Sequence, residues 1–161
     1  MNYVYALRFG NILKVGQTTN RGRARGTSGY AFERSLYGKP VCMLQHLTNS
    51  RLEDEDYLLS EARFLFGKPC FGREWFSCGR VNPRCLEMLA LVLGGNLRGR
   101  MWSAKGWLGR RVRLQNLAEK PKLNGRRGLV VGHGRDGRLH VILTRGRCVS
   151  VSPDSVTVHD L

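Results

Sequence analysis

The sequence lacks the cysteine patterns of disulfide-bonded and zinc-binding domains. Its five cysteines are an odd number, and no two of them form a Cys-x-x-Cys pair. Disulfide frameworks use even counts and structural zinc sites use closely spaced pairs, so neither is indicated. Long apolar runs are also missing, since the run Leu89–Leu93 is far below the roughly 20 residues of a membrane span. No secretory signal pattern opens the chain. We therefore expect an intracellular protein, in the cytoplasm, nucleus or nucleoid, with no membrane partner.

Acidic residues are scarce. The 161 residues include 27 Lys and Arg but 12 Asp and Glu, which gives a formal net charge of +15. Residues 1–94 hold thirteen basic and eight acidic residues, a net charge of +5, whereas residues 95–161 hold fourteen and four, a net charge of +10. With 42% hydrophobic residues the chain has the composition of a folded protein. A polyanion is thus the expected partner, and nucleic acid is the first candidate.

The first part of the chain shows signals for a small sheet with helices. Residues 2–8 and 11–16 alternate in polarity around a Phe-Gly-Asn turn, which predicts a hairpin, and 40–47 predicts a third strand. Thr19 or Asn20 can cap a short helix. Residues 49–66 predict a longer helix, capped by Asn49 or Ser50 and ended by Gly67. A nearly all-apolar helix is expected at 83–93, after a short buried extension at 72–76.

The last third of the chain shows short strand signals separated by turns. They lie at 110–114, 128–132, 139–143, 148–152 and 156–158. Five strands this short predict a small β-barrel, because closure protects their edges. The predicted organisation is a domain at 1–94, a linker at 95–107 and a basic barrel at 108–161. The predicted fold class is α+β: a small mixed sheet with flanking helices, followed by the barrel.

Several motifs in the first part occur in the order typical of one family. VYAL at 4–7, KVGQTTN at 14–20, an arginine cluster, an acidic helix and GREWF at 72–76 follow one another. Residues 2–93 thereby resemble the GIY-YIG nuclease superfamily, in its phage-type and meiotically upregulated branch. Residues 108–158 resemble a KOW or SH3-like barrel, through LNGRRGLVV at 123–131 and PDSV at 153–156. The resemblance implies a metal-dependent endonuclease with a nucleic-acid-binding barrel.

The resemblance also implies the catalytic residues. Tyr5 takes the position of the first signature tyrosine, near the attacking water. Lys14 replaces the second signature tyrosine, as a phosphate contact or, with a lowered pKa, as a base. Arg25 is the expected phosphate-binding arginine, with Arg23 as the alternative, and Tyr30 is expected near the water.

The implied metal is Mg²⁺ or another divalent ion, held by one helix carboxylate. Counting back from GREWF favours Glu61, with Glu55 and Glu53 as alternatives. A single carboxylate suits Mg²⁺ because this ion keeps most of its waters. Glu74 is interpreted as a packing residue beside Trp75 rather than a catalytic one.

Arginines in both parts are candidates for binding nucleic acid, which we expect to be DNA. Such contacts position the backbone and carry little sequence information. The candidates are Arg21, Arg23, Arg110, Arg111, Arg126 and Arg127. Two other interpretations stay open: a nuclease-derived binding protein without catalytic activity, and a barrel that recruits a protein.

Overall fold

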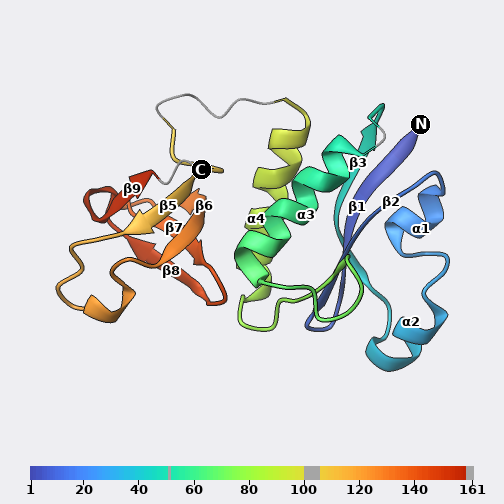
Figure 1. Ribbon diagram of the computed structural model, residues 1–161, viewed down its shortest axis with the longest axis horizontal. Coiled ribbons are helices and arrows are strands. Elements are labelled where there is room, and N and C mark those ends of the chain that lie inside the picture. Colours follow the sequence, from blue (N-terminus) through green and yellow to red (C-terminus); the bar gives the residue numbers. More distant parts are fainter. Residues whose placement is uncertain (51, 100–105, 159–161) are drawn as a thin grey trace. The chain divides into compact units, whose positions relative to one another are not determined.

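The computed structural model describes residues 1–50, 52–99 and 106–158, which form two compact units, Met1–Gly79 and Arg80–Leu161 (Figure 1). The general α+β class is confirmed. The expected domain boundary after Gly94 lies within a continuous helix, and residues 100–105 of the expected linker lie outside the described residues. In the described ranges, no helix has the length and apolar character to cross a membrane.

The first unit contains a four-stranded sheet in the order β3-β1-β2-β4. Its strands are β1 (Asn2–Phe9), β2 (Ile12–Thr18), β3 (Val41–Thr48) and β4 (Trp75–Ser77). Gly10 adopts a φ of 57° in the tight connection between β1 and β2. The expected mixed sheet is wrong, because every strand pair is antiparallel. The hairpin connection reverses β2 against β1, and the long segment before β3 carries the chain back across the sheet, so β3 also runs against β1.

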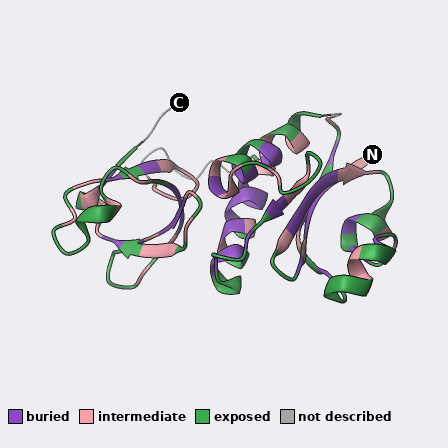
Figure 2. Cartoon of the chain, turned by 60° about the horizontal axis from the view of Figure 1, so that its bottom comes forward, coloured by how far each residue is buried: buried purple, intermediate pink, exposed green. Residues whose placement is uncertain are grey.

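Helices cover both faces of this sheet (Figure 1). One face carries α1 (Arg21–Arg25) and α2 (Ala31–Tyr37), while α3 (Glu53–Phe66) packs against β2 and β4. Side chains alternate along a strand, so Tyr5, Leu7 and Phe9 share the α1 face and form a buried cluster with Ala24 and Tyr30. In Figure 2, β1 and β2 are largely buried whereas α2 is exposed.

The caps explain where these helices begin. Asn20 is the N-cap of α1, and its Oδ1 accepts the Arg23 backbone N–H at 3.0 Å, as one of the two candidate caps predicts. The prediction for α3 is wrong: its N-cap is Leu52, which makes no side-chain hydrogen bond. Ser50 Oγ still accepts the Asp54 backbone N–H at 3.3 Å, and Gly67 ends the helix as expected.

The second unit combines one helix with a five-stranded antiparallel sheet. The helix α4 (Pro83–Leu97) begins at Asn82, whose side chain accepts the Cys85 backbone N–H, and packs against β6. The sheet order is β8-β7-β6-β5-β9. The strands are β5 (Arg111–Leu114), β6 (Arg127–His133), β7 (Leu139–Leu143), β8 (Cys148–Val151) and β9 (Val156–Val158), with short 3-10 helices η1 (Pro121–Leu123) and η2 (Pro153–Ser155).

All five strands lie within a residue or two of their predicted positions, but the predicted closure is not observed. In the described residues no ladder joins β8 to β9, so the hydrogen-bonded order is open. The three-residue β9 pairs with β5 alone, which leaves one of its edges unpaired. The sheet still encloses one apolar core, which includes Val112, Val130 and Val141.

A close backbone approach between β6 and β7 generates a stability prediction. A Cβ atom added at Gly128 would lie 2.5 Å from the Ile142 carbonyl oxygen. We expect Gly128→Ala to lower the free energy of unfolding of this unit by about 2–4 kcal/mol, because the clash is with backbone. Amide hydrogen exchange of β6 and β7 measures the effect.

Gly137→Ala is the matched control for this substitution. Gly137 has a φ of 81° but open space around its Cβ position, so the loss is limited to backbone strain, about 1 kcal/mol. Equal losses for the two variants contradict the assigned packing of β6 on β7.

Candidate functional site

Tyr5 and Gly16 form the centre of the candidate site. They are cross-strand partners on β1 and β2, so their side-chain positions share one face of the sheet. The Tyr5 ring lies directly over Gly16: a Cβ atom there would lie 2.7 Å from the Tyr5 hydroxyl oxygen and 2.9 Å from Cζ. Gly16 therefore serves the packing of Tyr5 within a strand, and its φ is not in the left-handed region.

Tyr30 meets Tyr5 from the start of α2. Its backbone is left-handed, with φ 59° and ψ 34°, a costly conformation for a non-glycine residue that directs its ring back to the sheet. The two phenol hydroxyls form a hydrogen bond with each other. Burial, followed by this bond, raises the pKa of Tyr5. Tyr5 is therefore a neutral phenol at physiological pH.

Arg23, rather than Arg25, is the arginine brought to the two tyrosines. Its guanidinium carbon lies 4.8 Å from the centre of the Tyr30 ring. The interaction with Tyr30, and then with Tyr5, raises the pKa of Arg23, so its charge is fixed. The charge of Arg25 acts instead on the Cys42 thiol, where it opposes the rise in pKa that burial causes. Arg21, the first residue of α1, is exposed.

Lys14 lies on the same sheet face and is 6% exposed. Its Nζ donates a hydrogen bond to Glu74 Oε2 and lies 5.5 Å from the centre of the Trp75 ring. Burial, followed by the charge of Arg23, lowers the pKa of Lys14 to about 8. Glu74 was expected to serve packing alone, so its ion pair with Lys14 is a feature that sequence reasoning missed.

Aromatic rings enclose this group of polar side chains. Trp75 lies 5.6 Å from Phe9 and 6.2 Å from Tyr30 between ring centroids, and Phe71 stacks on its other side at 5.1 Å. The half-exposed Phe71 places the outer ring of this group at the surface. Such walls exclude water and strengthen the interactions of the charges beside them.

Of the three candidate carboxylates on α3, Glu55 acts on the site. Its negative charge favours the protonated form of Lys14, together with that of Glu33. Burial raises the pKa of Glu55, and the Lys14 charge opposes that rise. Glu61 is buried in the middle of the helix, and Glu53 is its first residue. Six residues separate Glu55 from Glu61, which places them about 120° apart around the helix axis.

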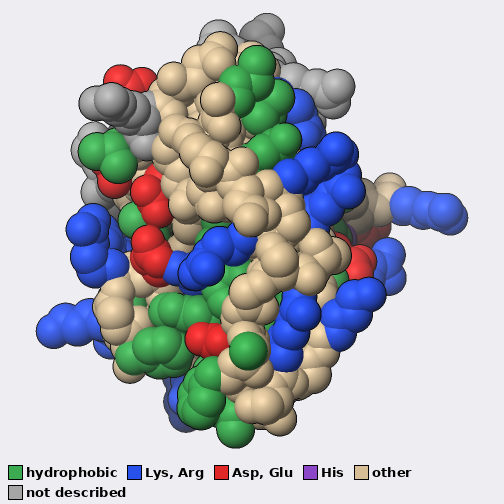
Figure 3. Space-filling model, turned by 90° about the vertical axis from the view of Figure 1, so that its right-hand side faces the viewer, with side chains coloured by type: hydrophobic (Ala, Val, Ile, Leu, Met, Phe, Trp, Pro, Cys, Tyr) green, Lys and Arg blue, Asp and Glu red, His purple; other side chains and the backbone are tan. Residues whose placement is uncertain are grey.

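The face that carries α1 and α2 is rich in basic side chains (Figure 3). Hydrophobic side chains lie among them. Phe32 and Leu36 lie four residues apart on one side of α2. Nothing in the described residues buries this apolar pair, since the two side chains are 71% and 59% exposed. The surface around the candidate site is therefore both cationic and apolar.

The four arginines predicted to bind nucleic acid in the second unit lie in or directly before two neighbouring strands. Arg111 is the first residue of β5 and Arg127 is the exposed first residue of β6, and Arg110 and Arg126 immediately precede them. Arg126 is partly buried, and its Nη2 donates to the Thr144 carbonyl oxygen at 2.7 Å. The structure thus brings these four arginines to one sheet of the second unit.

No family model, curated protein or solved structure matches the chain. In the described ranges, no group of three or more His, Cys, Asp and Glu residues is placed to hold a metal ion.

The environment of Lys14 generates a titration prediction. We expect its Cε resonance to titrate with a midpoint near pH 8 rather than at the ordinary value of 10.5, because burial disfavours the ammonium form. In Glu74→Gln the midpoint falls further, since the carboxylate that stabilises the charged form is gone. Carbon-13 NMR of labelled lysine over a pH series measures both values. A native midpoint above 10, or a rise in the variant, contradicts this assignment.

Proposed function

We propose that the first unit is a GIY-YIG-type endonuclease domain that hydrolyses phosphodiester bonds of nucleic acid, with DNA as its substrate. The observation that carries the proposal is the convergence of Tyr5, Lys14, Arg23 and Tyr30, from four separate elements, on one face of the sheet. These residues come from the same ordered motifs that carry the family resemblance. The basic second unit, with five short antiparallel strands around one core, is proposed to be the SH3-like, nucleic-acid-binding part.

Each side chain has a chemical role in this proposal. Arg23 keeps its charge and stabilises the negative charge that develops on the phosphate. Lys14, with a pKa near 8, accepts the proton of the attacking water in its neutral form. The two linked phenols of Tyr5 and Tyr30 orient that water through their hydroxyls. Burial keeps Tyr5 protonated, so it acts as a hydrogen-bonding group rather than as the base.

A divalent ion, Mg²⁺ in the first place, completes the proposal. When bound, it acts as a Lewis acid toward the phosphate and the leaving oxygen. Glu55 would hold it, because this carboxylate already interacts with Lys14 and is partly desolvated. The family spacing favours Glu61 instead, and the two positions are separable by mutation.

Plasmid nicking tests the catalytic proposal. We expect the native protein to nick supercoiled DNA in Mg²⁺, and Tyr5→Phe and Arg23→Ala to lose at least about 100-fold in rate, because each removes a group that contacts the reacting atoms. Arg25→Ala is the matched control and keeps the native rate, since the charge of Arg25 acts on the Cys42 thiol instead. The absence of nicking by the native protein in Mg²⁺ and Mn²⁺ leaves a binding protein without catalysis.

The metal ligand is tested by Glu55→Gln and Glu61→Gln, which preserve side-chain size. We expect Glu55→Gln to abolish nicking and Glu61→Gln to retain it. Added Mn²⁺ gives an independent measurement, because its paramagnetism broadens amide signals near the ion. Broadening around the start of α3 in the native protein, lost in Glu55→Gln, is expected. The reverse pattern assigns the ion to Glu61.

A further inference from the structure

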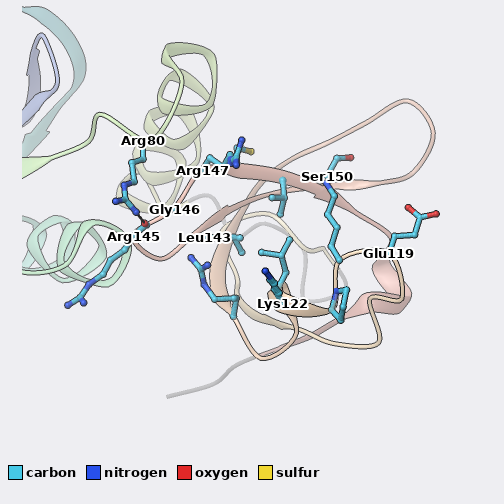
Figure 4. A pocket seen from close by; sticks show the side chains of 14 residues that line it. Arg80, Glu119, Lys122, Leu143, Arg145, Gly146, Arg147 and Ser150 are labelled. Atoms are coloured by element: carbon cyan, nitrogen blue, oxygen red, sulfur yellow. Dashed lines mark hydrogen bonds between the residues drawn. The ribbon is translucent and has the colours of Figure 1, made fainter.

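A broad groove, separate from the candidate site of the first unit, lies within the second unit (Figure 4). It encloses about 1160 Å³ between η1 and the β7–β8 turn, and fourteen residues line it. Glu119 is its one acidic lining residue and lies toward the end away from Arg80 and Arg145 (Figure 4). Its basic lining residues are Arg80, Lys120, Lys122, Arg126, Arg145 and Arg147.

Two of the four guanidinium groups of this groove are held by neutral partners. Arg126 Nη2 donates to the Thr144 carbonyl oxygen at 2.7 Å, and Arg80 Nη1 donates to the Arg145 carbonyl oxygen at 3.2 Å. Backbone carbonyls position a guanidinium without cancelling its charge. In the part of the chain that the structure describes, none of the six basic residues forms an ion pair with a carboxylate. The groove therefore keeps a strong positive charge.

The turn between β7 and β8 contributes to this charge at a cost in backbone energy. Arg145 has a φ of 52°, a conformation that normally favours glycine or asparagine. The next residue, Gly146, lies against Arg126, since a Cβ atom there would be 2.9 Å from Arg126 Nη2. A small residue at 146 thus leaves room for the Arg126 guanidinium, while the backbone carbonyl of Arg145 holds that of Arg80.

The remaining lining indicates which anion fits. Its apolar part consists of aliphatic side chains such as Leu123, Leu143 and Val149. None of the fourteen lining residues is aromatic, so the groove offers no stacking platform for unpaired bases. Proline-rich peptides also dock on aromatic-lined grooves, which this one is not. The phosphates of a base-paired duplex, by contrast, can be bound by positive charge without any aromatic platform.

We propose that this groove binds the phosphate backbone of duplex DNA without reading its bases. The inference rests on the nucleic-acid substrate of the proposed function, but not on cleavage. The groove includes Arg80, Lys120 and Lys122, which are not among the residues predicted from sequence to bind nucleic acid. This second, non-catalytic contact would keep DNA bound to the chain while the candidate site of the first unit hydrolyses it.

Fluorescence anisotropy with a labelled duplex of about 20 base pairs, in EDTA so that no cleavage occurs, tests the groove. The variant pair K122E/R147E changes two exposed lining residues, and the one hydrogen bond that the structure describes between Arg147 and the groove uses its backbone carbonyl oxygen, which the substitution keeps. We expect at least about a tenfold loss of affinity near 0.1 M salt, and a log–log salt slope reduced by about two. K122Q/R147Q is expected to give a smaller loss of affinity, and it replaces K122E/R147E in the test if the charge reversal unfolds the chain.

R113E/R135E is the matched control, with the same change in net charge at exposed residues of the second unit outside the groove. It is expected to bind within about threefold of the native chain. Equal losses in the two double variants overturn the groove, because general surface charge then explains binding. A single-stranded oligothymidine that binds as tightly as the duplex, or polyglutamate that competes equally well, also overturns it.

Binding measured in EDTA, where no cleavage occurs, separates this inference from the proposed function. Loss of binding in K122E/R147E supports the groove even if no variant cleaves DNA. Native binding in K122E/R147E overturns the groove even if the nuclease proposal holds.

Discussion

The contact of the Tyr5 ring with Gly16 is the constraint on which the candidate site depends. It exists because the β1–β2 hairpin places the two residues opposite each other, so a shift of register by one residue would turn Tyr5 to the other face. With the ring flat over the glycine, its hydroxyl reaches Tyr30, and Tyr30 in turn lies under Arg23. The site is thus an outcome of strand register, and any larger residue at 16 would displace the phenol.

Most strands and helices were predictable because their residues alternate or repeat in burial, or carry caps and turn residues. The missing element is α2, a seven-residue helix in which Phe32 and Leu36 are the one apolar pair at helical spacing, too short a pattern to predict a helix. The choice between Arg23 and Arg25 was open for a different reason. Spacing from Gly16 leads to Ala24, which lies between the two arginines, so a shift of one residue either way selects one of them. Two residues apart on a helix, the arginines point about 160° away from each other, and sequence spacing does not decide which one faces the tyrosines.

The expected break at Gly94 shows where glycine signals fail. Gly94 and Gly95 are buried in α4, which continues to Leu97. Gly109 packs near this end of the helix, since its Cβ position lies 3.3 Å from Val92 Cγ1. Glycines at close contacts and glycines in turns look alike in sequence, so the helix end was placed too early. Barrel closure could not be predicted either, because the lengths and spacing of strands do not determine which strand edges form hydrogen bonds with each other.

Burial acts on the titratable groups of the first unit in one direction, toward neutrality. It raises the pKa of the Tyr5 phenol and lowers that of the Lys14 ammonium, whereas the exposed Arg23 keeps its charge because its interactions with Tyr30 and then Tyr5 raise its pKa further. The candidate site thereby combines one fixed positive charge, an amine with a pKa of about 8 and a phenol that keeps its proton. The ordinary pKa values of tyrosine and lysine, 10.0 and 10.5, would let the phenol lose its proton first, so it is burial that reverses their order.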